Sequence, residues 1–519
     1  MKSISTSLLL SIAIFSGLAT YFWFVCDDAF ISFRYSDNLA NGYGLLYNHS
    51  EKPPIEGYSN FLWVILGTVI IWLGFDISQI IPCFSILSGI IGLIVLEKTL
   101  KFFQIPKKIQ AFSLLSTAIF PPYFIYGTSG LETLPAAVSL FGCFVYLLIE
   151  KKLLTACFFA ICLALLRPEG ILWVLVISVL SIFNCNFKLT FKFLGIVFSI
   201  FTIYFCWRWN YFEELLPVTV VNKVGLTSFT FLRGLDYLAI YLFTYLLPFL
   251  LLTLLLFTFK NSLKNRLKST IILLTGGLFI YPLTSGGDFM TSGRFFVTTV
   301  LFQSLIIALT LNQIKIIQLK YILTISFCLI SIASCLSAFN LGLVPKSILS
   351  KFHFRLNTPE YRTEAQQHAY MKYNSERWHI LGKTLHQHTE PGDSIVAGAI
   401  GNLGFYSKRH IYDRFGLVEK RVANLSNQER QIKSPGHDKA VKADFFLDKN
   451  PTILKAYIMP TSNQERIKNQ LKRWQNQYEN KYQGEEHPLE YIDSKNRQLT
   501  VLILRLINDK NFINEKTES

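Results

Sequence analysis

The chain opens with an apolar run that ends abruptly in two acids: residues 5–35 read STSLLLSIAIFSGLATYFWFVCDDAFISFRY. The run from Ser5 to Val25 carries no charge and is long enough to cross the hydrocarbon core of a bilayer as a helix. It closes on aromatic residues, which favour the membrane–water interface, and no small-residue cleavage site follows them. We therefore expect a retained first span, with Asp27 and Asp28 just outside the membrane.

The composition of the whole chain is that of a membrane protein with a polar C-terminal part. Of its 519 residues 51% are hydrophobic and only 16% are charged, whereas a soluble domain carries about 25% charged residues. Apolar runs recur to about Phe339, and the chain from Lys351 onward has none. These patterns predict a polytopic α-helical membrane domain over residues 1–340, an extracytoplasmic α/β domain over 341–508, and a disordered tail over 509–519.

Membrane topology, rather than nucleic acid binding, explains much of the formal net charge of +16. The rest lies in the C-terminal part, where it would suit anionic lipid headgroups or an acidic glycan. Breaks with basic residues alternate along the chain with breaks that carry acids. The apolar segments lie at 5–25, 60–75, 79–97, 109–126, 133–149, 153–167, 170–183, 193–209, 237–259, 270–285, 294–312 and 318–339. The basic breaks contain Lys98, Lys101, Lys107, Lys108, Lys151, Lys152, Lys188, Lys192, Lys260, Lys264, Arg266, Lys268, Lys315 and Lys320. Because cytoplasmic loops carry the excess of basic residues, these breaks are predicted to be inside and the acidic ones outside.

This alternation holds only if the segments 60–75 and 79–97 together cross the membrane once. We therefore expect 60–75 to be an interfacial or partly inserted helix in a long first outer loop, residues 26–78, and about eleven spans in total. An odd number of spans places the C-terminal domain outside. The predicted location is the inner (cytoplasmic) membrane, with this domain and the active site on the periplasmic side.

Acid-bearing segments gather on the predicted outer face. Charged groups at membrane depth are costly, and they are usually paired, exposed to water or functional. Ordinary loop charges near the interface explain any single segment as well as a site does, whereas several segments on one face, each beside Gly or Pro breaks, favour a site. The segments are Cys26–Tyr35, Gly127–Glu132, Leu166–Gly170 with Arg167 and Glu169, and Gly286–Met290 with Asp288 and the nearby Arg294.

Transfer of a sugar from a lipid phosphate would use this set of side chains. The phosphate is already a good leaving group, so the reaction needs a carboxylate that takes the proton of the acceptor hydroxyl and cations that hold the phosphate. Asp27 or Asp28 can be the base. The guanidinium groups of Arg34, Arg167 and Arg294 can hold the phosphate, because a planar guanidinium bonds two oxygens at once.

The same acids also offer a metal site. Oxygen ligands suit Mg²⁺ or Mn²⁺, and Asp28 and Glu132 are the candidate ligands if a divalent ion is used. The remaining acids of the outer face, Glu169 and Asp288, are then candidates for substrate binding together with Glu132.

The first outer loop holds three characteristic blocks, Asp27–Tyr35, Asn38–Asn48 and Glu56–Trp63. These blocks resemble the GT-C glycosyltransferases and, more narrowly, the AftB-type polyprenyl-phosphate arabinofuranosyltransferases. The first block is specific, whereas Arg-Pro-Glu-Gly alone is a weak signal. Later segments match in order to about residue 460, namely Gly130–Thr133, Arg167–Gly170, Gly286–Met290, Gly398–Gly401, Tyr406-Ser407, Asp413, Gly416-Leu417 and Pro435–Lys439.

The resemblance implies a GT-C-like fold, a polyprenyl-monophosphate sugar donor, inversion at the anomeric carbon on the outer face, and a base within the aspartate pair. It also makes Tyr58 and His437 candidate substrate-binding residues, with His437 facing the acceptor; a histidine in such a stretch is more often a surface or core residue. Asn402-Leu403 depart from the family pattern, and the tail beyond about residue 460 has no match. The sugar, arabinofuranose or another pentose or hexose, and the acceptor therefore stay open.

The polar C-terminal part reads as a small α/β domain. Residues 364–388 form an amphipathic pattern with Tyr370, Met371 and Trp378 on its apolar side. Ser394–Ile400 reads as a buried strand before a Gly-rich turn, and Pro451–Met459 and Leu499–Leu504 read as further strands. The turn at Gly398–Gly401 lacks the GxGxxG spacing of a dinucleotide site.

The leading function hypothesis is a membrane glycosyltransferase whose partners are a polyprenyl-phosphate sugar, an envelope glycan or glycolipid acceptor and membrane lipids. A transporter or flippase for a lipid-linked sugar is the competing class. Transporters show related halves with broken helices at mid-depth, whereas here the acids sit at span ends on one face and no half repeats the other. A ligase that uses a lipid-pyrophosphate donor shares the chemistry and stays open.

Overall fold

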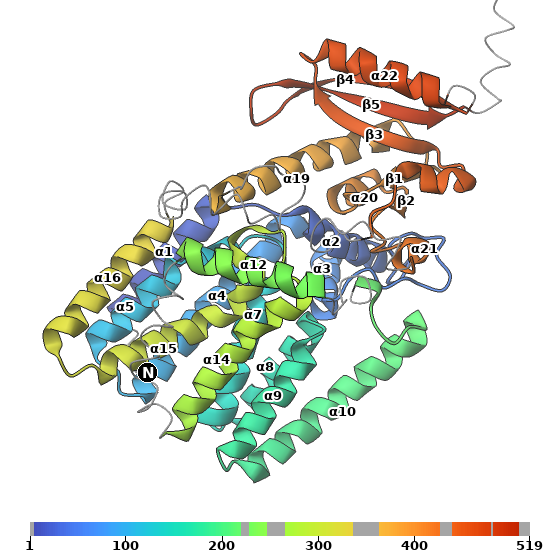
Figure 1. Ribbon diagram of the computed structural model, residues 1–519. Coiled ribbons are helices and arrows are strands. Elements are labelled where there is room, and N and C mark those ends of the chain that lie inside the picture. The colour runs from blue at the N-terminus through green and yellow to red at the C-terminus, as the bar shows by residue number, and fades with distance from the viewer. Residues whose placement is uncertain are drawn as a thin grey trace, which may run out of the picture.

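The computed structural model describes residues 5–219, 228–245, 265–335, 363–425, 439–478 and 481–507. The first part consists of helices: α1 Thr6–Tyr21, α2 Asp27–Ala40, α3 Phe61–Trp72, α4 Ile77–Phe102, α5 Lys107–Ala118, α6 Pro121–Ile125, α7 Thr133–Phe144 with η1 Val145–Ile149, α8 Leu153–Leu166, α9 Gly170–Phe183, α10 Phe187–Phe212, α12 Ser228–Tyr245, α14 Arg266–Ser285, η2 Thr291–Thr299, α15 Val300–Gln313 and α16 Ile317–Cys335. The second part is an α/β domain on one end of this bundle, as Figure 1 shows. The predicted order, a helical part followed by an α/β part, is observed.

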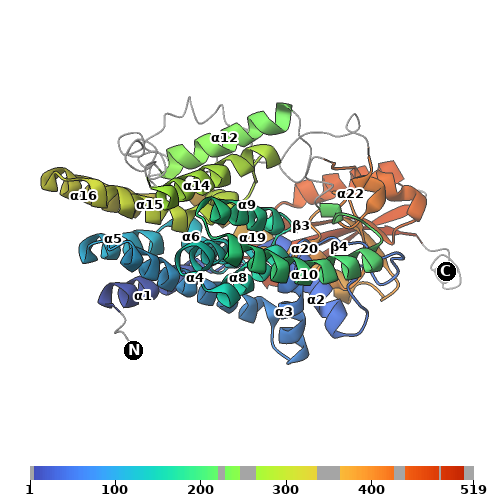
Figure 2. The same cartoon turned by 90° about the horizontal axis from the view of Figure 1, so that it is seen from below.

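Apolar helices of membrane-crossing character fill the bundle. In the described ranges, four are long and apolar enough to cross a membrane: Ile77–Phe102, Phe187–Phe212, Arg266–Ser285 and Thr291–Gln313. Shorter apolar helices, α1 and α7 to α9 among them, pack beside these. Viewed from below (Figure 2), α12 and α14 lie along one side of the bundle and α1 and α4 along the other. The total of about eleven spans stays a prediction, because the segments predicted at 237–259 and 318–339 extend beyond the described residues.

The basic breaks meet at one end of the bundle, as the charge pattern predicts. The Nζ of Lys98 lies 2.8 Å from a carboxylate oxygen of Glu150, and the Nζ of Lys108 lies 5.7 Å from the ring of Tyr321. Breaks that are far apart in sequence are therefore neighbours in space. The α/β domain lies at the opposite end, where the loops after α6 and α8 carry the acids.

The length of helix α3 bears on whether the segment predicted at 60–75 crosses the membrane by itself. With 12 residues it is about 18 Å long, too short for a hydrocarbon core of about 30 Å. Helix α3 packs on α2 and α4. The expectation that 60–75 and 79–97 together cross the membrane once stays a prediction.

The α/β domain is built on one mixed sheet. Among the described residues its strands are β1 Ser394–Ala397, β2 His410–Asp413, β3 Ile453–Pro460, β4 Tyr482–Ile492 and β5 Gln498–Leu506, in the order β2-β1-β3-β5-β4. Strand β1 runs parallel to β2 and β3, and β5 is antiparallel to β3 and β4. The helices of this domain are α19 Glu364–Gln387, α20 Gly401–Ser407, α21 Lys420–Ala423, η3 Ala443–Lys449 and α22 Gln464–Tyr478.

Helix α19 matches the amphipathic segment predicted at 364–388. Thr363 and Gln366 form a capping box at its start, which satisfies two backbone N–H groups that a helix N-terminus otherwise leaves unpaired. Figure 1 shows α19 running from the bundle towards the sheet, so one rigid helix connects the two parts.

Helix α2 fixes the α/β domain to the bundle. The guanidinium of Arg34 is buried, and it donates to the backbone oxygens of Tyr47, Gly404 and Arg409 at 2.8, 2.8 and 2.6 Å. The hydroxyl of Tyr47 donates to the backbone oxygen of Ile400 at 2.6 Å. The two backbones approach so closely that a Cβ on Gly404 would lie 1.9 Å from the Tyr47 hydroxyl.

The closest approach of the two parts gives a first prediction. A Cβ on Gly401 would lie 1.8 Å from the backbone oxygen of Asp27, so Gly401→Ala forces α20 away from α2. Overpacking of this kind costs about 1–3 kcal/mol. We expect a lower melting temperature for purified full-length Gly401→Ala and faster proteolysis of its α/β domain.

The matched control is Gly392→Ala, because no described atom lies within 4 Å of a Cβ added at Gly392. Equal melting temperatures of the two variants would contradict the tight α2–α20 contact.

Candidate active site

A cavity of about 660 Å³ lies between the bundle and the sheet. Its membrane-side wall contains Asp27 and Asp28 at the start of α2. Its opposite wall is formed by the segments after β1 and β2, together with one face of α19. In open sheets with parallel strands, ligands bind at the carboxyl ends of those strands. The cavity thus joins the predicted acids to the part of the sheet where binding sites form.

Asp27 is held by the α/β domain. Its carboxylate accepts hydrogen bonds from the backbone N–H of Asn402 at 2.7 Å, from the backbone N–H of Gly401 at 3.2 Å and from the side-chain amide of Asn402 at 3.2 Å. Burial raises the pKa of Asp27 to about 6, against the lowering effect of these donors, and the charge of Asp28 adds to the rise. The group is therefore ionised at neutral pH and committed to fixed partners.

Asp28 is placed differently from its neighbour. It is half-buried and lines the cavity, and no described residue donates a hydrogen bond to it. It interacts electrostatically with Arg294. Of the two predicted bases, Asp28 is the one whose oxygens are available to a ligand.

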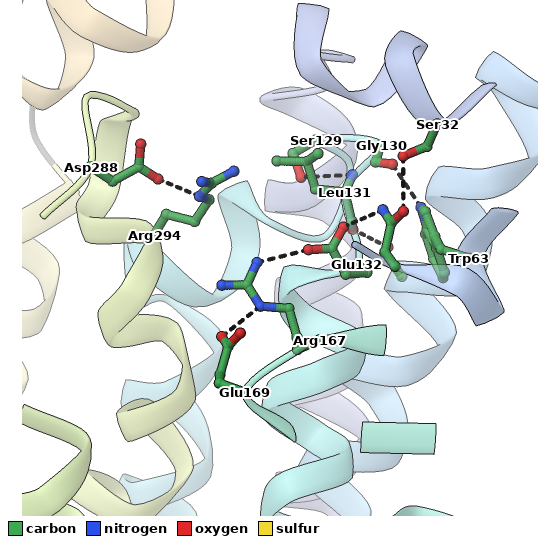
Figure 3. A network of polar contacts seen from close by, with 12 residues as sticks. Ser32, Trp63, Ser129, Gly130, Leu131, Glu132, Arg167, Glu169, Asp288 and Arg294 are labelled. Atoms are coloured by element: carbon green, nitrogen blue, oxygen red, sulfur yellow. Dashed lines mark hydrogen bonds and ion pairs between the residues drawn. The ribbon is translucent and has the colours of Figure 1, made fainter. Parts of the chain in front are cut away.

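A second polar group, shown in Figure 3, lies at the end of the bundle that faces the α/β domain. Arg167 forms ion pairs with Glu132 at 2.8 Å and with Glu169 at 2.9 Å. The other carboxylate oxygen of Glu132 accepts from the amide of Asn60 at 2.8 Å, and Asn60 in turn accepts from the hydroxyl of Ser32 at 3.0 Å. The structure thus brings Glu132, Arg167 and Glu169 together, and it ties them to α2.

Arg294 and Asp288, which both lie in the segment after α14, form an ion pair. Ser292 and Gly293 adopt left-handed φ angles of 57° and 58°, and this kink directs Arg294 into the bundle. Figure 3 shows the guanidinium groups of Arg294 and Arg167 facing the same space between the helices. Apart from Asp288 and the ring of Phe295, 5.3 Å away, no described residue engages the Arg294 guanidinium in a polar or cation–π contact.

Helix α19 holds the loop that carries Arg294. The carboxylate of Glu364 accepts from the backbone N–H of Ser292, and the hydroxyl of Thr291 donates to the backbone oxygen of Glu364 at 2.7 Å. The amide of Gln367 donates to the backbone oxygen of Phe289 at 3.0 Å. The α/β domain therefore contacts both sides of the cavity floor, through α20 at Asp27 and through α19 at this loop.

Among the described residues that the sequence predicts as site residues, Asp27 and Asp28 line the cavity, whereas Arg34, Tyr58, Glu132, Arg167, Glu169, Asp288 and Arg294 do not. Arg34 uses its donors on backbone oxygens of the interface described above, and it does not line the cavity. Tyr58 is buried against Tyr35 and Phe212, with ring centroids at 4.8 and 6.2 Å. His437 lies outside the described residues.

The residues proposed as metal ligands do not fit a joint site. Both carboxylate oxygens of Glu132 are already bonded, one to Arg167 and the other to Asn60. Among the described residues no group of three or more His, Cys, Asp or Glu side chains could hold a metal ion. Asp28 is therefore available for proton transfer rather than for a metal ion shared with Glu132.

Several cavity residues were not identified from the sequence as site residues. Tyr370, Met371 and Trp378 were expected only as the apolar side of α19, and they line the cavity. Arg414, which lies between the matched residues Asp413 and Gly416, and Lys442 line it as well. Asn402, which binds Asp27, falls where the chain departs from the family pattern, so only the three-dimensional contact identifies it.

Comparisons with known proteins bear on the fold. Residues 360–501 match a family described as Domain of unknown function (DUF8728), and no curated protein matches the chain. The chain is similar to the crystal structure of ArnT from Cupriavidus metallidurans bound to undecaprenyl phosphate, with a TM-score of 0.53, 11% identity, and 95% of this chain and 97% of that chain covered. The crystal structure of the same ArnT in the apo state gives a TM-score of 0.49 at 11% identity, with the same coverage of 95% and 97%. ArnT is a GT-C glycosyltransferase. The similarity to its undecaprenyl-phosphate complex over 95% of this chain shows that the chain has the GT-C fold.

Proposed function

We propose that this protein is a membrane glycosyltransferase that moves a sugar from a polyprenyl-phosphate donor to an envelope glycan or glycolipid acceptor. The observation that carries the proposal is the position of Asp28, an available carboxylate on the wall of a 660 Å³ cavity. Arg294 does not line this cavity, but it interacts electrostatically with Asp28. The shared fold supports the donor class, because the crystal structure of ArnT contains undecaprenyl phosphate.

Asp28 is the proposed general base. It would take the proton of an acceptor hydroxyl as that oxygen attacks the anomeric carbon, with inversion, while the bond to the lipid phosphate breaks. Asp27 is a positioning residue, because the donors of Gly401 and Asn402 occupy its carboxylate. In this proposal Asp28 reacts with the substrate, and Asp27 holds the α/β domain in place.

Arg294 is the proposed phosphate ligand. Negative charge grows on the phosphate as the glycosidic bond breaks, so a cation at this place stabilises the transition state more than the ground state. Arg167 is already neutralised by Glu132 and Glu169, and we assign it to holding α8 and α9 at the outer end of the bundle.

The active site is proposed to face the periplasm from the inner membrane, because the basic breaks lie at the opposite end of the bundle. The resemblance to AftB-type enzymes favours arabinofuranose as the sugar, with another pentose or hexose as the alternative. The donor assay below names the sugar and separates transfer from the transport of a lipid-linked sugar.

Asp28→Asn keeps the size of the side chain and removes the base. Because a positioned general base contributes about 10²–10⁴-fold to rate, we expect transfer to fall by at least about 100-fold. The measurement is release of polyprenyl phosphate by the purified chain in nanodiscs, with polyprenyl-phosphate sugars offered one at a time. Wild-type turnover by Asp28→Asn would remove Asp28 from the mechanism, and movement of lipid-linked sugar across liposomes without any release would favour a transporter.

Arg294→Lys keeps the charge beside Asp288 but loses the planar pair of donors, so the phosphate is held less well. We expect kcat/KM for the donor to fall about 10-fold or more, in line with a lost charge-assisted hydrogen bond. Arg266→Lys, at the opposite end of the bundle, is the matched control. Equal donor dependence in the two variants would exclude Arg294 from the phosphate site.

The role of Asp27 gives a pH-dependent prediction. The fold raises the pKa of Asp27 from 3.8 to about 6, so between these values the folded protein binds the proton more tightly than the unfolded chain does. The contribution of Asp27 to stability is therefore largest below pH 4 and decreases as the pH rises to about 6. The melting temperature of the wild type relative to Asp27→Asn should rise when the pH is lowered from 7 to 4. A difference that does not change with pH would mean that Asp27 titrates normally.

A further inference from the structure

The two walls of the cavity carry opposite charge. The membrane-side wall contains Asp27 and Asp28. The wall of the α/β domain contains Arg414, Lys442 and Lys455, together with Asp444. The proposed transfer step uses the acids and Arg294, and it leaves these cations of the α/β domain without a function.

One of these cations is neutralised within the domain. The Nζ of Lys455 lies 3.5 Å from a carboxylate oxygen of Asp444, and it donates to the hydroxyl of Tyr478 at 2.5 Å. This lysine and this acid thus cancel each other, which leaves Arg414 and Lys442 as the source of positive charge on the wall.

The backbone holds Arg414 and Lys442 together. The backbone N–H of Val441 donates to the backbone oxygen of Arg414 at 3.0 Å, and the Nε of Arg414 donates to the backbone oxygen of Val441 at 2.8 Å. Lys442 follows directly in the chain. No described acid pairs with either side chain, so the terminal nitrogens of Arg414 and the ammonium of Lys442 are available to a ligand.

Aromatic rings line the same cavity as the acids and the cations. Tyr370 and Trp378 come from α19, and Phe415 and Tyr457 come from the sheet side of the cavity. Sugar rings carry apolar C–H faces that pack on aromatic rings, while their hydroxyls need polar partners, which Asn374 supplies on the same wall. The volume falls within the range of about 300–1,000 Å³ that small-molecule sites occupy.

We propose that this region is an acceptor subsite for an anionic saccharide. The aromatic rings hold its sugar units, and Arg414 and Lys442 bind its phosphate or carboxylate, so that one of its hydroxyls reaches Asp28. The inference rests on the proposed transferase function and adds the chemical class of the acceptor. The phosphate of the donor is a separate group, because its lipid chain keeps it at the membrane side, where Arg294 lies. The two substrates thus have separate cations, one in the helical bundle and the others in the α/β domain.

Binding to the full chain in nanodiscs of zwitterionic lipid tests the proposal. The probes share one backbone: cellobiose, cellobiose 6-phosphate and cellobiouronic acid, titrated calorimetrically at low and at high salt. We expect at least one anionic probe to bind about 10-fold more tightly than cellobiose, and the preference to shrink at high salt because it is electrostatic. Comparing the affinities of cellobiose 6-phosphate and cellobiouronic acid identifies whether the site prefers a phosphate or a carboxylate.

The variant Arg414→Gln/Lys442→Gln should reduce the preference to less than about twofold and leave the binding of cellobiose unchanged, since it removes only charge. Lys442→Gln alone, at an exposed position, covers the case in which the double variant folds poorly, and it should lower the preference in part. Lys468→Gln, exposed on α22 and outside the cavity, is the matched control.

Equal affinity for the three probes, no binding of any of them, or an undiminished preference in Lys442→Gln and in the double variant would overturn the inference. Hydrolysis of the donor, in which water takes the place of the acceptor and polyprenyl phosphate is released, separates this failure from that of the proposed function. If release depends on Asp28 while the anionic preference is absent, only the acceptor assignment is wrong. If no donor is turned over, the proposed function fails whatever the probes do.

Discussion

The architecture depends on one set of hydrogen bonds, in which the carboxylate of Asp27 receives the N–H groups of Gly401 and Asn402. Asp27 is the first residue of α2, and the two donors begin α20, so one carboxylate serves the starts of two helices. Acids at helix N-termini are favoured by the helix dipole, and here both dipoles act on the same charge. Since Asp28 follows in the chain, this contact also determines which way the second carboxylate faces.

A buried carboxylate in such a place is costly unless it is fully bonded. The cost explains the side chains that surround it. The amide of Asn402 donates both to Asp27 and to the hydroxyl of Ser375, and that hydroxyl donates to the backbone oxygen of Val25. The chain of bonds ties α19, α20 and the end of the first span to one another. The cavity is the space left between these attachments, and it has a fixed shape because both of its walls are anchored at its edge.

Sequence reasoning reached the parts of this arrangement that local patterns determine. The charge alternation identified which helix ends share a face, because each break is read from its own few residues. The strand Ser394–Ala397 and the helix at Glu364 also follow from local periodicity and capping. The aspartate pair was predicted as a site from the acid-bearing segments on one face and from the family resemblance, and both aspartates line the cavity; their role in catalysis stays a proposal. The GT-C fold is now shown, whereas the narrower likeness to arabinofuranosyltransferases stays a proposal.

The separate roles of the site residues could not be predicted from local sequence patterns. Asp27 and Asn402 are 375 residues apart in the chain, and nothing near either residue indicates the contact. The same holds for Arg34, whose partners at Gly404 and Arg409 are equally distant in sequence. A charged residue beside a membrane predicts that some partner exists, but it does not say whether the partner is a substrate or the protein itself.

The number of partners that an arginine has within the protein indicates whether it holds the structure together or is available to a substrate. Arg34 bonds backbone oxygens on three sides, Arg167 binds two carboxylates, and Arg208 binds Glu56 and two backbone oxygens. A guanidinium with its donors so occupied gains little from a phosphate, because it would first have to break bonds of equal strength. Arg294 and Arg414 have fewer partners than donors among the described residues; Arg294 interacts electrostatically with Asp28, and Arg414 lines the same cavity as Asp28. The saturated arginines thus position helices, and the unsaturated ones are those that we propose bind an anionic group of each substrate near Asp28.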